Sequence, residues 1–158
     1  MNRSDALLAL LGASGYPYTV LEHAEARTAE EAAAARGTPL AVGGKSVLMR
    51  AERVGDVVIV VGSDRRIEGR ALRKALGIQR YRFASPEELL ALSGLRHGEL
   101  PAFARPLFEA ELVVGEDFLD REEIVFAAGS ATRSVRMRIG DWVAAARPRI
   151  VPPFTLPA

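Results

Sequence analysis

The stretch Val57-Val58-Ile59-Val60-Val61 decides the fold, because every one of its residues is apolar and β-branched. A strand with one face in water alternates apolar and polar residues, whereas a strand buried on both faces needs no polar residue at all. Residues 57–61 are therefore predicted to form a strand in the middle of a sheet, with packed layers on both sides.

The residues before this stretch predict its partner strand. Residues 42–51 and 56–61 both have strand composition, and residues 52–55 join them over the length of a hairpin turn, with glycine where a positive φ is expected. Lys45 is therefore expected beside the central strand, where a neighbouring strand holds it rigidly.

Lys45 belongs to the stretch Gly43-Gly44-Lys45-Ser46, which looks at first like the end of a phosphate-binding P-loop. The P-loop pattern needs a glycine five residues before Gly44, and that residue is Pro39. A P-loop also joins a strand to a following helix, whereas here a predicted helix comes first and a predicted strand follows. These two mismatches argue against a nucleoside triphosphate site of this type.

Composition singles out Lys45, because only two of the 21 basic residues are lysines and the rest are arginines. A lysine carries a compact ammonium whose pKa responds to burial, whereas an arginine carries a rigid, permanently charged fork. Lys74, the other lysine, is predicted on the polar side of a helix and needs no function. Two interpretations of Lys45 remain open, a point charge in a binding site and a solvated surface lysine.

The rest of the chain alternates short helices and strands. Capping and stop signals predict helices from Ser4 to near Gly15, at 28–36, at 68–76, at 85–93 and after Asp141. Extended or alternating segments predict further strands at 16–21, 80–83, 107–114, 123–127 and 134–139. Clustered strands, interspersed helices and hairpin-length connections indicate an α+β domain around a mixed, mostly antiparallel sheet.

One long segment is predicted to have no regular structure. Residues 94–106 are punctuated by glycine and proline, yet they carry Leu100 and Phe103 as apolar anchors. Loops of this length inside a compact domain are either functional or disordered, and the anchors favour an ordered functional loop.

Length, charge and composition bound the function. Residues 1–158 are expected to form a single domain, with a proline-rich, non-helical tail at 147–158. A net charge of +1 argues against a protein that wraps many phosphates, but not against one that grips the end of an RNA. Without cysteine and with only two histidines, the chain is expected to need no disulfide, metal or other cofactor. The first residues lead into an amphipathic helix and no apolar run reaches membrane-spanning length, so a cytoplasmic protein is expected.

Taken in order, these features resemble the YbaK family of aminoacyl-tRNA deacylase domains over nearly the whole chain. The resemblance is carried by the Lys45 strand, the buried strand, the loop at 94–106 and these further segments: Leu21-Glu22-His23, Thr28-Ala29-Glu30-Glu31-Ala32-Ala33, Leu72-Arg73-Lys74-Ala75-Leu76-Gly77, Ala84-Ser85-Pro86-Glu87-Glu88-Leu89 and Ala127-Ala128-Gly129-Ser130. It implies a six-stranded, mixed and mostly antiparallel, barrel-like sheet flanked by helices. It also implies a small substrate cleft between the lysine strand, the loop and the late glycine turn.

The resemblance further implies an activity. Members of the family hydrolyse the ester that joins a mischarged amino acid to the 3′ end of tRNA. The chain would then be a free-standing trans-editing deacylase of the prolyl-tRNA editing type that acts on a small amino acid. Its expected partners are aminoacyl-tRNA and a synthetase, with no membrane, DNA or cofactor involved.

The site residues implied by the resemblance carry over position by position. Lys45 takes the place of the family's key lysine and is the expected catalytic residue, and the backbone amide of Gly98 is expected to face the substrate. The expected substrate-binding residues are Ser46, His97, Gly98, Phe103, Gly129, Ser130, Thr132 and Arg133. Water, assisted by a ribose hydroxyl of the tRNA, is the expected nucleophile, with loop amides stabilising the oxyanion.

The sequence departs from the family pattern at four positions. The family loop commonly has proline where His97 and Ala102 stand and glycine where Ala104 stands. Many deacylase members have a histidine where this chain has Arg133, which cannot act as a base near neutral pH. Two alternatives therefore stay open, a non-catalytic module that binds an aminoacyl-tRNA end or a synthetase, and a hydrolase for another small ester.

Two groups of arginines are candidate contacts for tRNA phosphates, and a solvated arginine-rich surface is the alternative. The first group lies around the third predicted helix and the second around the last predicted strand. They are Arg65, Arg66, Arg70 and Arg73, and Arg133, Arg136 and Arg138.

Overall fold

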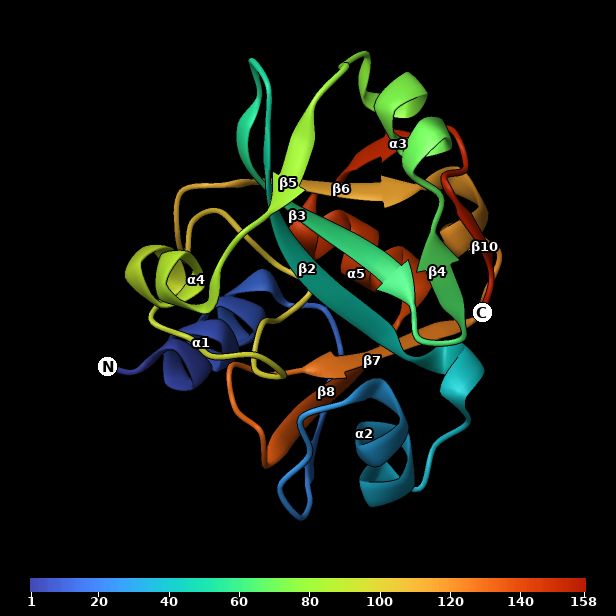
Figure 1. Cartoon of the computed structure of the whole chain (residues 1–158). Helices are drawn as coiled ribbons and strands as arrows, with labels where there is room; N and C mark the ends of the chain where they lie inside the picture. The colour runs from blue at the N-terminus through green and yellow to red at the C-terminus, as the bar shows by residue number, and fades with distance from the viewer.

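The computed structural model describes residues 1–158 and arranges strands β1 to β10 in three sheets (Figure 1). The largest sheet has five strands in the order β5-β2-β3-β6-β9, the second has three in the order β1-β8-β7, and the third pairs β10 with β4. The strands are β1 (Thr19–Glu22), β2 (Gly44–Ala51), β3 (Gly55–Gly62), β4 (Arg65–Ile67), β5 (Tyr81–Phe83), β6 (Glu111–Gly115), β7 (Glu123–Ala127), β8 (Arg133–Arg138), β9 (Arg149–Val151) and β10 (Thr155–Pro157). Parallel and antiparallel pairs occur together, so the predicted α+β class with a mixed sheet is confirmed.

The chain also forms five α-helices, and none is long and apolar enough to cross a membrane. They are α1 (Arg3–Ser14), α2 (Ala29–Arg36), α3 (Gly69–Leu76), α4 (Pro86–Ser93) and α5 (Ile139–Ala146), with 3-10 turns η1 (Leu40–Val42) and η2 (Glu116–Leu119). The predicted capping box of Ser85 and Glu88 begins α4. The predicted Ser4 cap is wrong, because the side chain of Asn2 accepts the hydrogen bond from the Asp5 amide and starts α1 two residues earlier.

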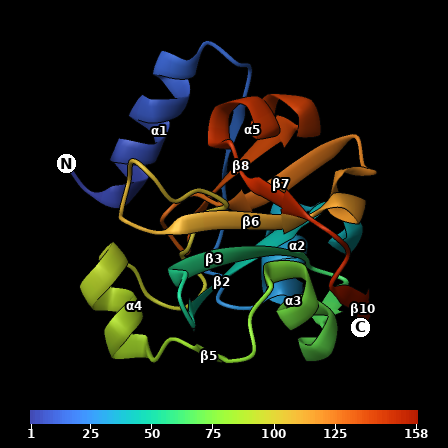
Figure 2. The ribbon, with the colours of Figure 1, turned by 90° about the horizontal axis from the view of Figure 1, so that it is seen from above.

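Strand β3 is the centre of the five-stranded sheet, as predicted. Val58 and Val60 belong to one hydrophobic core, which α1, α5 and β7 also line. Val57, Ile59 and Val61 belong to a second core, which α3 and the end of the chain line. Figure 2 shows the sheet between these layers, with α3 on one side and α1, α5 and the β7–β8 pair on the other.

Strand β2 pairs with β3 along its whole length in an antiparallel hairpin. The turn contains Gly55 at φ +88°, which is the left-handed conformation that the sequence predicted for a glycine. The register places Lys45 opposite Val61 of the central strand. Lys45 therefore stands on one of the most firmly held strands of the fold.

The expected single six-stranded, barrel-like sheet is not found, because the strands divide between a five-stranded and a three-stranded sheet. The two sheets meet at the isolated bridge between Gly43 and Val125. A Cβ at Gly44 would lie 2.8 Å from Ile124 Cδ1 and 3.2 Å from Phe118 Cζ. The glycine pair thus lets the start of β2 pass close against β7, but one bridge does not close a barrel.

The proline-rich tail is non-helical as predicted, but it is built into the sheets. Strand β9 pairs in parallel with β6, and β10 pairs with β4. Phe154, between them, is 1% exposed in the second core. Pro148 and Pro152 flank β9, which is an edge strand, where the missing amide donors cost no interior ladder bond.

The loop at residues 94–106 is anchored in the first core. Leu100, Ala102 and Phe103 are buried, and the ring of Phe103 lies 5.8 Å from that of Phe126. Trp142 of α5 is fully buried, and its Nε1 donates a hydrogen bond to the Ala102 carbonyl at 2.8 Å. The loop is therefore held by packing and by one buried hydrogen bond, which agrees with the prediction of an ordered loop.

Replacing Trp142 with phenylalanine is expected to lower the free energy of unfolding by about 1–3 kcal/mol, because the buried Ala102 carbonyl loses its donor. Urea titration followed by circular dichroism measures the change. The control is Phe83→Leu at an aromatic side chain that is 52% exposed, which should change stability by less than about 0.5 kcal/mol. Equal effects of the two substitutions would show that the Trp142 hydrogen bond does not hold the loop.

Candidate functional site

Lys45 lies in the wall of a cavity of about 280 Å³. Three segments that are distant in sequence enclose the cavity: the start of β2, helix α2 with the residues just before it, and the loop at 94–106. Of the expected site residues, Lys45, Ser46, His97 and Gly98 line it together. The structure therefore places the lysine strand opposite the glycine- and proline-containing loop.

The ammonium of Lys45 has no carboxylate partner within ion-pair distance, whereas Arg27, another basic residue of the cavity, has two. The backbone of Lys45 is fixed by the ladder between β2 and β3, so only the side chain is free to adjust. A compact ammonium on a rigid strand can bind a carbonyl oxygen or an anionic oxygen of a ligand.

Gly98 lines the same cavity and requires glycine for two reasons. Its φ is +87°, and a Cβ would lie 2.8 Å from the Arg27 Cα. No protein acceptor takes up its N–H. Gly98 therefore has a backbone amide without a protein acceptor at a residue that lines the cavity, and an amide of this kind can stabilise a developing oxyanion when it faces a ligand.

The hydroxyl of Ser46 is buried and has no hydrogen-bond partner in the protein. A buried polar group without a partner is unfavourable. Ser46 is one of the residues that line the cavity, and its hydroxyl oxygen is covered by the protein atoms around it.

Helix α2 contributes Ala29, Glu30, Ala32 and Arg36, and three of these, Ala29, Ala32 and Arg36, recur at the spacing of one helical face. The small alanines leave space beside β2, and Arg36 extends from the last turn. Its Nε donates a hydrogen bond to Ser134 Oγ at 2.8 Å. Burial lowers the pKa of Arg36 to about 10, and no carboxylate pairs with it.

Sequence reasoning missed Arg36, which it treated only as the end of an alanine-rich helix. The available signal was the spacing of Arg36 from Ala29 and Ala32, which predicts one shared face. Nothing local to the sequence indicates which way that face points.

The remaining expected site residues do not line the Lys45 cavity. Phe103 is fully buried in the first core. Gly129 packs against α1, since a Cβ there would lie 3.0 Å from the Ser4 amide nitrogen. The hydroxyls of Ser130 and Thr132 lie 3.1 Å apart in the turn before β8.

Arg133 is the last of these expected residues, and it is held by acidic neighbours. Its Nε lies 3.2 Å from Glu22 Oε1, and its Nη1 lies 3.7 Å from Asp5 Oδ1. The guanidinium thus joins β8 to β1 and α1 at the surface.

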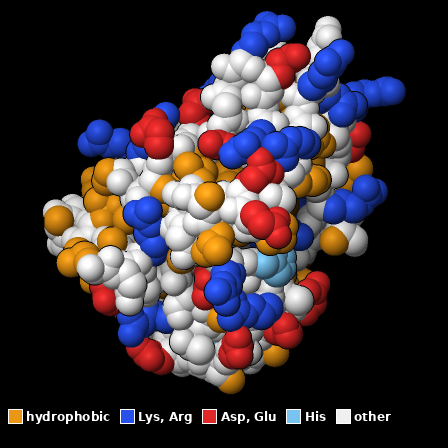
Figure 3. Space-filling model, turned by 60° about the vertical axis from the view of Figure 1, so that its left-hand side comes forward, with side chains coloured by type: hydrophobic (Ala, Val, Ile, Leu, Met, Phe, Trp, Pro, Cys, Tyr) orange, Lys and Arg blue, Asp and Glu red, His pale blue; other side chains and the backbone are white.

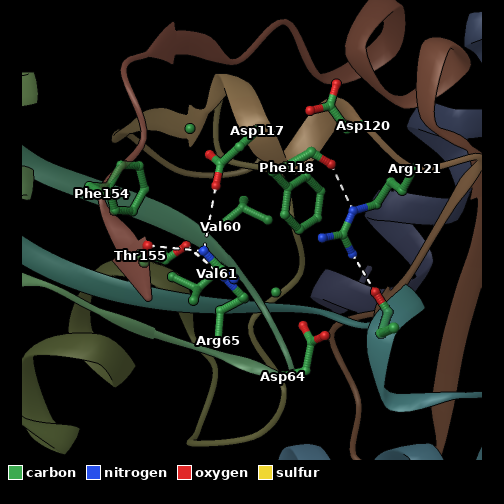
Figure 4. Close-up of a pocket in the computed structure, with 13 residues that line it drawn as sticks. Val60, Val61, Asp64, Arg65, Asp117, Phe118, Asp120, Arg121, Phe154 and Thr155 are labelled. Carbon is green, nitrogen blue, oxygen red and sulfur yellow. Dashed lines mark hydrogen bonds and ion pairs between the residues drawn. The ribbon is translucent and has the colours of Figure 1, made fainter. Parts of the chain in front are cut away.

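A second cavity, of about 460 Å³, is lined by the end of β3, the start of β4, η2 and the residues that follow it, and Phe154 and Thr155 (Figure 4). Within it Arg65 donates to the Thr155 carbonyl at 3.0 Å and lies 3.9 Å from Asp117. Arg121 lies over the Phe118 ring at 3.7 Å and donates to two carbonyls, those of Phe118 and Ala41. Its basic side chains are thus occupied by protein groups, and none of the expected site residues lines it.

The arginines considered as phosphate contacts differ in their surroundings. Arg136 forms a two-point contact with Glu123 at 2.7 and 2.8 Å. Arg66, Arg70, Arg73 and Arg138 form no ion pair, whereas Arg65 and Arg133 do. Figure 3 shows acidic side chains beside basic ones over the visible face, without one large basic patch.

Comparison with known proteins bears on this site. The chain is 29% identical over 151 residues to the Multifunctional Ser/Thr-tRNA deacylase ProXp-y of Escherichia coli (strain K12), an alignment that covers 92% of this chain and 89% of the relative. The same identity and coverage hold for the protein of that name from Escherichia coli O157:H7.

Solved structures share the fold at lower identity. A protein described as a candidate trans-editing enzyme for prolyl tRNA synthetase has a TM-score of 0.79 and 24% identity, covering 96% of this chain and 97% of the other. A hypothetical protein of known structure has a TM-score of 0.83 and 22% identity, covering 95% and 99%. At these identities the likeness concerns the fold alone.

The family comparison covers most of the chain. The model of the aminoacyl-tRNA editing domain matches residues 23–145, a span that includes α2, the Lys45 strand, the loop and β8. The Lys45 cavity is thus built from segments inside the matched region. The chain belongs to the family of aminoacyl-tRNA editing domains.

Proposed function

We propose that this protein hydrolyses aminoacyl-tRNA in trans, releasing a small mischarged amino acid from the 3′ end of the tRNA. The observation that carries the proposal is the cavity in which the unpaired Lys45 ammonium and the free Gly98 amide line the same space. Membership of the editing-domain family and the similarity to a tRNA deacylase support an ester of this kind as the substrate.

The reaction needs few protein groups. When water attacks the ester carbonyl, negative charge develops on the carbonyl oxygen, and donors aimed at that oxygen lower the barrier. We assign this role to the Gly98 amide and the Lys45 ammonium, whose residues both line the cavity. The ribose oxygen of the tRNA leaves, and a neighbouring ribose hydroxyl of the substrate can orient the water.

The cavity favours a small side chain that carries a hydroxyl group. Its volume of about 280 Å³ is at the lower end of ligand pockets, and Ser46, whose buried hydroxyl has no partner in the protein, is one of its lining residues. A hydroxyl of the bound amino acid would give Ser46 its hydrogen bond. The Escherichia coli relative is named a Ser/Thr-tRNA deacylase, which supports serine or threonine as the released amino acid.

The finer assignment to prolyl-tRNA editing has less support. The solved structure described in those terms is 24% identical, and its likeness to this chain concerns the fold. We therefore base the proposed amino acid, serine or threonine, on the properties of the cavity. The tRNA is to be identified with a panel of substrates.

Lys45→Ala is expected to lower the rate of deacylation by about 100-fold or more, as the loss of one oxyanion donor does in other hydrolases. The measurement is release of amino acid from a panel of mischarged tRNAs. The control is Lys74→Ala, which removes the only other lysine, an exposed residue of α3. The two variants should have equal stability and very different rates.

Equal rates for the wild type and Lys45→Ala on every tRNA would refute the proposed function. Tight binding of aminoacyl-tRNA by the wild type without turnover would instead identify the protein as a binding module.

Ser46→Ala is expected to reduce kcat/KM for seryl-tRNA by about tenfold relative to alanyl-tRNA, because one hydrogen bond to the substrate is lost. The free energy of unfolding of Ser46→Ala should equal or exceed that of the wild type, since the buried hydroxyl has no partner in the free protein. Ser130→Ala, in the turn outside the cavity, is the matched control. An unchanged ratio between the two substrates would show that Ser46 does not read the amino acid.

A further inference from the structure

The Lys45 cavity contains more positive charge than the protein itself neutralises. Its basic residues are Arg27, Arg36 and Lys45, and its single acidic residue is Glu30. Arg27 is paired with Glu25 at 2.8 Å and with a second carboxylate at 3.5 Å. Glu30 takes part in no ion pair, so Arg36 and Lys45 both remain without an anionic partner.

Arg36 is the more unusual of the two cations. It is half-buried, and burial lowers its pKa to about 10, which leaves the guanidinium charged at neutral pH. Removing a charge from water without pairing it is unfavourable, and an anion in the cavity would offset that cost. Exposed arginines such as Arg66 carry no such cost.

A chain of hydrogen bonds fixes the orientation of the Arg36 guanidinium. Its Nε donates to Ser134 Oγ at 2.8 Å, and that oxygen lies 2.8 Å from His23 Nε2. The other ring nitrogen, Nδ1, lies 2.8 Å from the Ala24 carbonyl, which can only accept. In the neutral ring Nδ1 therefore carries the hydrogen, Nε2 accepts from the Ser134 hydroxyl, and the serine oxygen accepts from Arg36.

This arrangement uses the Nε of Arg36 and leaves the two Nη groups without a protein acceptor. Ser134 is fully buried, so water does not compete for the hydrogen bond that holds the Arg36 side chain. The free N–H groups form a planar fork, which matches the oxygens of a phosphate better than an ammonium does.

We propose that Arg36 forms an anion subsite in this cavity and binds the phosphate that links the terminal nucleotide of the tRNA to the preceding one. The inference rests on the proposed function, in which Lys45 and the Gly98 amide serve the ester carbonyl. The ester and this phosphate belong to the same nucleotide, so a substrate held at one brings the other near. Arg36 is thus a positioning residue that aligns the ester through the phosphate.

The test compares two small substrates that differ by one phosphate, 3′-O-seryl-adenosine and 3′-O-seryl-adenosine 5′-phosphate. The wild type is expected to prefer the phosphorylated ester by about ten- to 100-fold in kcat/KM, mainly through a lower KM, which is the range for hydrogen bonds to charged groups. Arg36→Gln should abolish that preference, so that the two esters have about equal kcat/KM. Arg36→Lys should keep part of it, because it keeps the charge without the fork.

A second measurement does not depend on catalysis. Calorimetric titration should show adenosine 5′-phosphate binding to the wild type more tightly than adenosine, and Arg36→Gln should remove the difference. Arg66→Gln is the control, since Arg66 lies outside the cavity and forms no ion pair. Thermal melting of each variant confirms that it is folded.

Several results would overturn the proposal. Equal affinity of the wild type for adenosine and adenosine 5′-phosphate would do so. An equal loss of affinity for both compounds in Arg36→Gln would also overturn it. A phosphate preference that survives in Arg36→Gln and disappears in Lys45→Ala would assign the phosphate to Lys45. If neither ester is hydrolysed, the nucleotide titration decides whether Arg36 binds phosphate, and the panel of mischarged tRNAs decides the proposed function.

Discussion

Two layers must cover strand β3, because Val58 and Val60 face one core while Val57, Ile59 and Val61 face the other. The helices α1 and α5 and the three-stranded sheet meet this need on one side, and α3 meets it on the other. A strand enclosed in this way has little freedom, and β2 takes its position from it through a continuous ladder. The position of Lys45 in the cavity therefore follows from burial of a strand that contains no functional residue.

Close backbone approaches shape the space around Lys45. Gly44 lies so near Ile124 and Phe118 that any side chain there would force the two sheets apart. Gly98 approaches the Arg27 backbone with equal tightness in the loop opposite. The cavity is thus bounded by main chain at two points, and its amide donor comes from the backbone. A site built this way tolerates changes such as His97 or Ala104 in the loop better than a change at either glycine.

The features that depend on residues close together in the chain could be predicted from the sequence. The apolar run of β3, the hairpin, the α4 capping box and the anchored loop could all be read from neighbouring residues, and the resemblance implied the meeting of Lys45 with His97 and Gly98. The division into two sheets could not be predicted from the sequence, since the two sheets meet through a contact between residues distant in sequence, Gly43 and Val125. Arg36 was missed for the same reason. Its orientation comes from Ser134, which is 98 residues away in sequence.

Under the proposed function, we expect the unpaired charges of the cavity to favour anionic ligands, because leaving these charges unpaired costs free energy in the free protein. Burial makes the unpaired charge of Arg36 costly, and the protein could offset that cost with one well-placed carboxylate. Glu25, Glu99 and Glu30 all lie near, yet two of them pair with Arg27 and the third pairs with no residue. A carboxylate bound to Arg36 would compete with a ligand anion for the same N–H groups. Leaving the fork free keeps a standing preference for anionic ligands, which is the behaviour expected of a site that recognises the end of a nucleic acid and reads little of its sequence.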